Sequence, residues 1–237
     1  MSWWIFFVKK ESKPFVITLY MTDICRNKLN YFMIAFLHTS SIHIDKFEKL
    51  VRLYDKEIQI QHFVNEDLLS SALKKGKTDT TTFGKEVAKM KEKQPSLLIC
   101  TCSTYGEECD NNVLIERIDE PIAAFLVSNF TKIGLAFTAN STKKVSENLL
   151  KRIASTNDKT IEIIECDCSS AWKYYEFNDF VNYEKSIAEN LKKMENEVEV
   201  VFLAQASMEG CRLYLNHFSK EIYSSPEYGV KHFITAN

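Results

Sequence analysis

The chain has 237 residues, of which 45% are hydrophobic and 26% charged, and its formal net charge is −2. This length fits one large domain or two small ones, and the charge gives no electrostatic case for binding nucleic acid. Seven cysteines are too sparse for a disulfide scaffold and indicate reduced thiols in a cytoplasmic protein. No apolar run approaches the ~20 residues that cross a bilayer, so no membrane partner is expected.

The N-terminal stretch differs from the rest of the chain. Its apolar patch, WWIFFV, precedes the positive charges, whereas a signal peptide carries its charge first. We expect residues 1–31 to form an extension outside the fold, with the domain beginning near Met33; a start codon assigned too early would give the same pattern.

Short apolar segments alternate with helix-like segments from residue 32 onward. The strands predicted in the first half are 32–38, 57–64 and 96–101. The helices predicted there are 45–55, 65–76 and 85–95. Asp45 and Glu48 have the spacing of a capping box, and Asn65 and Gly76 are typical first and last residues of a helix. The polar stretch 77–84 is predicted to be a loop.

The second half repeats this alternation. Its predicted strands are 132–139, 160–166 and 197–204, and its predicted helices are 141–155, 182–194 and 208–221. Strands separated by long helices predict an α/β fold. We expect two similar lobes, each a mostly parallel sheet flanked by helices, with an active-site cleft between them. The first lobe is predicted to comprise residues 32–120 and 213–237, and the second residues 121–212.

Two strand ends are alike in sequence. ICTCST (99–104) and LAQASM (203–208) each end a predicted buried strand and precede a helix. In this comparison Ser103 stands opposite Ser207, and Cys102 opposite Ala206. Ligands of α/β sheets bind beyond the carboxyl ends of the strands, so both turns are expected to face the cleft.

Four segments in order resemble the aspartate/glutamate racemase superfamily, and more narrowly its racemase-like branch, whose substrate is undefined. They are FLHTSS after the first strand, CTCST after the third, RIDEPIAAF at the crossover and VVFLAQASM near the end. The resemblance implies a two-lobed α/β fold with the site between the lobes. It also implies one cysteine at a strand end in each lobe, the two exchanging a proton with opposite faces of a carbon next to a carboxylate. Cys102 matches the first cysteine, and Ala206 stands where the second is expected.

Cys102 is the predicted catalytic residue. A thiol at a helix N-terminus is expected to have a lowered pKa, and Ser103 and Thr104 can bind a carboxylate through hydroxyl and backbone N–H groups. The alternative is that Cys102 is a small buried apolar side chain. The residues therefore favour a cofactor-independent racemase or isomerase acting on an amino acid or related small acid, and related folds often form homodimers.

Alanine at position 206 leaves several alternatives open. Ser207 or Glu209 could deliver the second proton through a water molecule, or Cys211 could point back toward the cleft. A one-cysteine decarboxylase, lyase or isomerase would need no second thiol. A catalytically inactive module that binds a small acid would need none either.

The remaining candidates are polar residues at other strand ends. Ser40 and Ser41 stand where the family binds the substrate carboxylate, or they cap a helix. Asn140, Ser141 and Thr142 can cap the next helix and bind a carboxylate. His38 could orient a ligand or be satisfied by the backbone, whereas His43 has no spacing that indicates chemistry. The two C-x-C pairs, at 100/102 and 166/168, do not fit zinc spacing, so no metal is expected. Asp119 is expected to be solvated or ion-paired.

Overall fold

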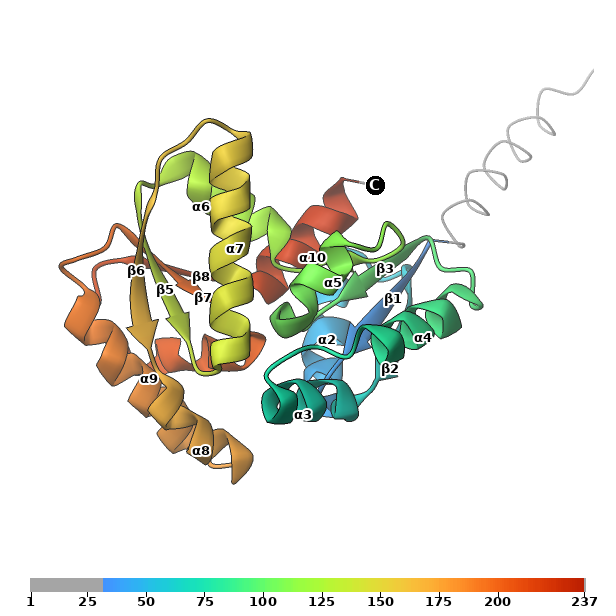
Figure 1. Cartoon of the computed structure of the whole chain (residues 1–237), viewed down its shortest axis with the longest axis horizontal. Coiled ribbons are helices and arrows are strands. Elements are labelled where there is room, and N and C mark those ends of the chain that lie inside the picture. The colour runs from blue at the N-terminus through green and yellow to red at the C-terminus, as the bar shows by residue number, and fades with distance from the viewer. Residues whose placement is uncertain (1–31, 237) are drawn as a thin grey trace, which may run out of the picture.

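The computed structural model describes residues 32–236, so the predicted extension of residues 1–31 lies outside the described residues. In the described part the strands form two four-stranded sheets, and every pairing is parallel (Figure 1). Both sheets have the same arrangement, with the first and third strands of each half in the centre. The predicted α/β class with two similar lobes is confirmed. None of the helices in this part combines the length and apolar composition needed to span a membrane.

The first sheet has the order β2-β1-β3-β4. Its strands are β1 (Met33–His38), β2 (Gln59–Val64), β3 (Leu97–Cys100) and β4 (Glu116–Arg117). The helices of this half are α2 (Ile44–Tyr54), α3 (Glu66–Lys75), α4 (Thr80–Lys91) and α5 (Gly106–Asp110), with short 3₁₀ helices η1 (Ser41–His43) and η2 (Ser103–Tyr105). The central strands β1 and β3 alternate between the two faces: Ile34, Phe36 and Ile99 pack with α2, whereas Ala35 and Leu37 pack with α3 and α4.

The second sheet has the order β6-β5-β7-β8. Its strands are β5 (Lys132–Phe137), β6 (Glu162–Asp167), β7 (Val200–Leu203) and β8 (Glu221–Ser224). The helices are α6 (Glu120–Asn129), α7 (Asn140–Thr156), α8 (Trp172–Glu176), α9 (Phe180–Met194) and α10 (Ser225–Thr235), with 3₁₀ helices η3 (Ser169–Ala171) and η4 (Ala206–Tyr214). One face of this sheet packs on α6 and α7, and the other on α9 and η4.

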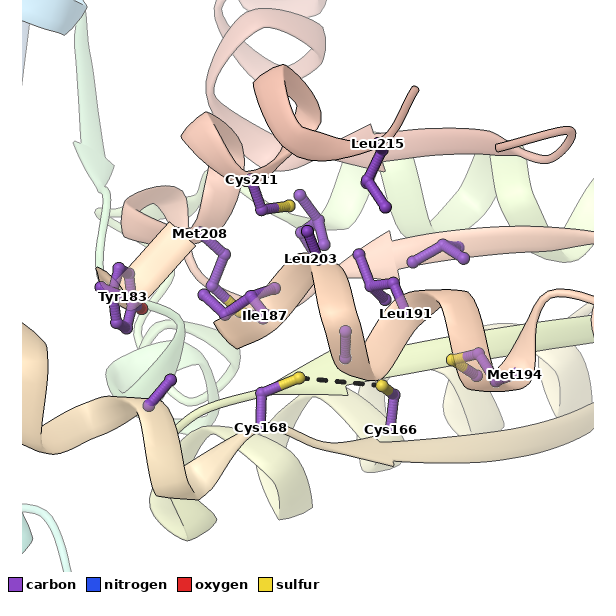
Figure 2. Close-up of a cluster of buried hydrophobic side chains, with 14 of the residues drawn as sticks. Cys166, Cys168, Tyr183, Ile187, Leu191, Met194, Leu203, Met208, Cys211 and Leu215 are labelled. Carbon is purple, nitrogen blue, oxygen red and sulfur yellow. Dashed lines mark hydrogen bonds between the residues drawn. The ribbon is translucent and has the colours of Figure 1, made fainter. Parts of the chain in front are cut away.

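The second of these faces contains three buried cysteines (Figure 2). Cys166 and Cys168 lie at the end of β6 with their sulfur atoms 3.7 Å apart, and Cys211 on η4 is fully buried in the same cluster. Burial raises the pKa of the Cys211 thiol to about 12. Cys211 therefore does not point back toward the cleft, and it packs as a small apolar side chain.

Helix ends in the first half agree only partly with the prediction. Asn65 does cap α3, accepting a hydrogen bond from Asp67 N, and Gly76 ends that helix with φ of 66°. The predicted loop 77–84 is wrong, because the Asp79 side chain accepts from Thr82 N and starts α4 at Thr80. The capping box is also wrong: α2 continues directly from η1, and its first residue is Ile44.

The C-terminal region departs most from the prediction. The expected helix 208–221 is wrong. Three segments stand in its place: the 3₁₀ helix η4, then a turn in which His217 has φ of 65°, then the start of strand β8. Strand β8 pairs with β7, so residues 221–224 belong to the second sheet, whereas α10 packs on α2 of the first half. The lobe boundaries at 120 and 213 stay a prediction. Proline at the start of α10 was the missed sequence feature.

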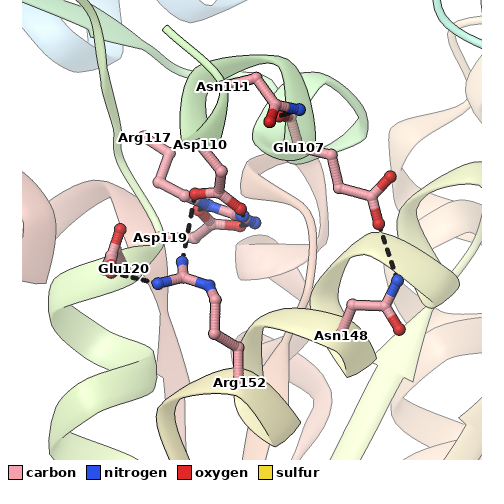
Figure 3. A network of polar contacts seen from close by, with 8 residues as sticks. All are labelled: Glu107, Asp110, Asn111, Arg117, Asp119, Glu120, Asn148 and Arg152. Atoms are coloured by element: carbon pink, nitrogen blue, oxygen red, sulfur yellow. Dashed lines mark hydrogen bonds and ion pairs between the residues drawn. The ribbon is translucent and has the colours of Figure 1, made fainter. Parts of the chain in front are cut away.

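A buried arginine joins the segments at the crossover (Figure 3). Arg117 Nε and Nη2 donate to the two carboxylate oxygens of Asp119 at 2.7 and 3.1 Å, and Nη1 donates to Asp110 at 2.7 Å. Asp110 also accepts from Arg152 on α7. A Cβ at position 106 would collide with the Arg117 guanidinium, which explains the glycine there. Asp119 is therefore ion-paired and buried.

Candidate active site

The hydrogen-bond register relates the two halves at the strand ends. Thr101 N donates to Leu37 O in the first sheet, and Ala204 N donates to Ala136 O in the second. One residue further along, Cys102 immediately precedes η2 and Gln205 immediately precedes η4. Gln205 is thus the counterpart of Cys102, and the comparison that set Ala206 opposite Cys102 is shifted by one residue. The second half still has no thiol at the matching position.

Cys102 lines a small cavity between the two halves, about 40 Å³ in volume. Six of the predicted site residues line it: Ser40, Cys102, Ser103, Thr104, Thr142 and Ser207. We call this the thiol cavity. Asn140 and Ser141 line a neighbouring cavity instead. Ser41 lines neither, since its backbone N and its hydroxyl both donate to Glu66 Oε1, at 3.1 and 2.9 Å.

The environment of the Cys102 sulfur differs from the predicted one. The Thr39 side chain and the N–H groups of Thr104 and Tyr105 face the sulfur and favour the thiolate, as expected at the start of a helix. Burial has the larger effect, with a contribution from nearby Cys100, and the pKa of Cys102 is raised to about 11. The expected lowering of this pKa is therefore wrong, and the resting group is a thiol.

Hydroxyl groups bridge the halves beside the thiol. Thr104 Oγ1 lies 3.0 Å from Thr142 Oγ1 and 3.4 Å from Ser141 Oγ. Thr104 belongs to η2 of the first half, whereas Ser141 and Thr142 stand in the first turn of α7, which begins without a side-chain cap. The start of α7 thus places the Thr142 hydroxyl at the thiol cavity, where the helix dipole favours a carboxylate.

The wall opposite Cys102 is held by a second polar network. Gln205 Oε1 accepts from Thr138 N at 2.8 Å, from Thr138 Oγ1 at 3.0 Å and from Ala139 N at 3.2 Å. The Tyr183 hydroxyl lies 3.0 Å from Ser207 Oγ and 3.2 Å from Thr138 Oγ1. These contacts fix Ser207, a predicted substrate-binding residue, at the edge of the thiol cavity.

His43 also lines the thiol cavity, although its spacing in the sequence indicated no chemistry. Its ring lines the thiol cavity and the cavity beyond it, and no hydrogen bond to either ring nitrogen is found within residues 32–236. Burial and the nearby charge of Lys46 lower the pKa of His43 to about 4. His43 is therefore a neutral imidazole that faces the site. Its position depends on η1, which sequence periodicity did not reveal.

His38, in contrast, is a structural residue. It is fully buried, with Nδ1 2.8 Å from Thr101 Oγ1 and Nε2 2.8 Å from His62 Nδ1. Burial, together with His62 and His43, lowers the pKa of His38 to about 3. Both ring nitrogens already have partners, so His38 supports the floor of the site through Thr101 and does not contact a ligand.

Two aromatic residues from α8 close one side of the thiol cavity. Trp172 and Tyr175 stack with ring centroids 4.8 Å apart, and both line the cavity. Ser40 faces the Tyr175 hydroxyl, and burial raises the pKa of Tyr175.

The two C-x-C pairs do not form a common centre. Cys100 is buried in the first-half core while Cys102 lines the cavity, and the second pair is buried on the far face of the other sheet. In the described residues no group of three or more His, Cys, Asp or Glu side chains is placed to hold a metal ion.

Two larger cavities adjoin the thiol cavity. One, of about 640 Å³, shares Thr104 and Trp172 with the thiol cavity. The other, of about 560 Å³, shares His43, Tyr175, Ala206 and Ser207. The cleft is thus a narrow centre around Cys102 with a wider compartment on each side.

No protein-family model matches the sequence, and no curated protein matches it. Among solved structures, aspartate racemase from Picrophilus torridus is similar with a TM-score of 0.68 and 14% identity, covering 86% of this chain and 94% of that one. Glutamate racemase RacE1 from Bacillus anthracis gives 0.67 and 14%, covering 87% and 82%. Allantoin racemase from Klebsiella pneumoniae gives 0.60 and 10%, covering 86% of each chain. The described part of the chain therefore has the same fold as these aspartate, glutamate and allantoin racemases.

Proposed function

We propose that the protein is a cofactor-independent enzyme that moves a proton at the carbon next to the carboxylate of an amino acid or related small acid. The observation that carries this proposal is the position of Cys102. Its thiol enters a small cavity at the carboxyl ends of both sheets, surrounded by hydroxyl and N–H donors. The racemase fold supports the same reaction class.

Neutral donors would hold the substrate. The hydroxyls of Ser40, Ser103, Thr142 and Ser207 line the cavity beside the thiol. When the proton on the α-carbon leaves, its electron pair spreads into the carboxylate, and the added negative charge needs hydrogen-bond donors. The start of α7, where Thr142 lines the cavity, adds a helix dipole that favours this charge.

The raised pKa of Cys102 determines what the sulfur does best. With a pKa of about 11, only about one thiol in 10⁴ is ionised near neutral pH. Such a group donates a proton more readily than it accepts one. This favours, as a second candidate, a decarboxylase: the bond to the leaving carboxylate breaks, carbon dioxide departs, and the electron pair left on carbon takes the thiol proton. Water then reprotonates the sulfur.

Racemisation needs a second proton carrier, and His43 is the candidate in this cleft. Gln205 has no proton to exchange, and Glu209 is paired with Lys46 at 2.6 Å. His43 is neutral, lines the cavity, and has no hydrogen bond to its ring nitrogens within residues 32–236. It can therefore accept the α-proton from one face of the carbon while Cys102 supplies a proton to the other face. The imidazolium of His43 then loses its proton to solvent, and the thiolate of Cys102 takes one from solvent.

The test is incubation of the protein with a panel of amino acids and substituted malonates in deuterium oxide. Proton NMR, chiral chromatography and carbon dioxide release then distinguish the reactions. Racemase activity gives α-deuteration with inversion, and decarboxylase activity gives carbon dioxide with one deuterium at one face of the carbon.

Two variants separate the roles of the side chains. Cys102→Ser is expected to abolish either reaction, whereas His43→Gln is expected to abolish inversion only. Ligand-induced stabilisation with no exchange and no carbon dioxide would instead identify an inactive binding module, and full activity of Cys102→Ser would contradict the mechanism.

A further inference from the structure

The thiol cavity is too small for a complete substrate. Its volume of about 40 Å³ is far below the roughly 300–1,000 Å³ of typical ligand sites. It can take a group of the size of a carboxylate with its neighbouring carbon. The remainder of a bound acid must extend into one of the two cavities beside it.

The larger neighbour is suited to a long substituent. Its volume of about 640 Å³ falls within the range of ligand sites, roughly 300–1,000 Å³. It meets the thiol cavity at Thr104 and Trp172, which line both. Ala72, Leu73 and Val145 give it an apolar side. We call this cavity the lysine basin, for the two lysines described next.

Lys77 and Lys144 line the basin from opposite halves of the protein. Lys77 follows α3, and Lys144 stands on α7, and within residues 32–236 neither ammonium group has an ion pair or hydrogen bond. The acid among the lining residues is Glu107, whose Oε1 accepts from Asn148 Nδ2 at 2.7 Å (Figure 3). Among the described residues the basin therefore has an excess of unpaired positive charge, and neither lysine lines the thiol cavity.

The cavity on the other side offers no comparable charge. Its Lys46 is paired with Glu209 at 2.6 Å and also donates to Ala206 O at 3.1 Å. Its Arg212 donates to Ile222 O at 2.8 Å. Glu184 lines this cavity as well. An anionic group is therefore favoured in the lysine basin and disfavoured on the opposite side.

We propose that the substrate is an α-substituted acid with a long, partly apolar chain that ends in a second carboxylate, held by Lys77 and Lys144 in the lysine basin. This rests on the proposed function, which places the first carboxylate beside Cys102. The apolar lining residues of the basin contact the chain, and the basin's volume of about 640 Å³ leaves room for a chain longer than that of aspartate.

The test uses matched amino acids as probes. Binding of aspartate, glutamate, 2-aminosuberate and 2-aminooctanoate to the full chain is measured by calorimetry and by thermal shift. We expect 2-aminosuberate to bind more tightly than the short acids and than 2-aminooctanoate, which has the chain without the distal charge. The double variant Lys77→Gln/Lys144→Gln should weaken 2-aminosuberate roughly tenfold and leave 2-aminooctanoate unchanged.

The control is Lys91→Gln/Lys159→Gln, which removes two charges from exposed lysines that line neither cavity. It should keep wild-type affinity.

Three results would overturn the proposal: equal affinity for glutamate and 2-aminosuberate, an unchanged affinity for 2-aminosuberate in the Lys77→Gln/Lys144→Gln variant, or no binding of any of these acids. Deuterium exchange of the bound acid is scored separately: binding with the predicted length dependence but no exchange contradicts the proposed function alone, and exchange of short acids without length dependence contradicts the basin proposal alone.

Discussion

Gln205 occupies in the second sheet the position that Cys102 occupies in the first. Each residue lies two positions beyond the last residue of a central strand, Leu203 or Cys100, and each immediately precedes a 3₁₀ helix. The threonine after each first strand faces it: Thr39 faces the Cys102 sulfur, and Thr138 donates to Gln205 Oε1. The two halves thus share a scaffold in which a thiol on one side is replaced by an amide on the other.

Placing a thiol at this position tests the relationship. Gln205→Cys should put a second sulfur across the cavity from Cys102 and increase inversion relative to α-deuteration in deuterium oxide. The variant also loses three hydrogen bonds to Oε1, and we expect it to be less stable by about 1–3 kcal/mol. Gln205→Ala has the same loss without the thiol and is the control. Equal inversion by the two variants would mean that this position does not face the reacting carbon.

The sequence predicted the architecture better than the cleft. Apolar strands such as 32–38 and amphipathic helices such as 182–194 are local patterns, and these elements are present within a few residues. The stretch 208–221 failed because its helical spacing was overridden by pairing of Glu221–Ser224 with β7, a contact that periodicity does not encode.

The residues of the candidate site also differ in how far local sequence patterns identify them. Cys102, Ser103 and Thr104 were found because they directly follow a recognisable strand. His43, Trp172 and the lysine basin depend on how separate elements meet, and no local pattern identifies them. The direction of the Cys102 pKa was wrong for a related reason: the helix start was visible in the sequence, but the larger effect, burial, was not.

Alkylation of Cys102 should depend on pH as its raised pKa requires. Only the thiolate reacts with iodoacetamide, so the rate at Cys102 should rise about tenfold per pH unit across the range in which the protein stays folded, with no plateau near 8.5, the usual thiol pKa. Peptide mapping by mass spectrometry follows Cys102 separately, and free glutathione serves as the reference thiol. A plateau near neutral pH would show that the thiolate is the resting form.

Two histidines should make the fold sensitive to acid. The pKa values of His38 and His43 in the folded protein are lowered to about 3 and about 4, whereas the ordinary value is 6.5. Below about pH 6.5 the unfolded chain therefore binds more protons than the folded one, and the free energy of unfolding decreases as pH falls toward those values, by up to 1.4 kcal/mol per pH unit for each histidine.

Urea titrations at several pH values measure this loss. His43→Gln should reduce the loss between about pH 7 and about pH 5 by about 1–2 kcal/mol, because glutamine does not titrate. His232→Gln, at an exposed position of α10, is the matched control and should leave the wild-type slope. If the His43 and His232 variants lose stability equally with acid, then His43 is not held neutral in the folded protein.

Arg117 should be the most sensitive charged residue for stability. Its side chain is 3% exposed and that of Asp119 is 1% exposed, with two hydrogen bonds between them. Arg117→Leu leaves the Asp119 carboxylate buried without its partner, and we expect a loss of about 3–5 kcal/mol in the free energy of unfolding. Arg117→Leu/Asp119→Leu removes both charges and should recover part of this loss, because the destabilisation comes from the unpaired carboxylate.

The control is Lys151→Leu, which breaks the exposed pair with Glu147 on α7 and should cost no more than about 0.5 kcal/mol. Urea denaturation of the three variants decides the matter: if Arg117→Leu costs as little as Lys151→Leu, or if the double variant is as unstable as the single one, the energy does not reside in the buried charge.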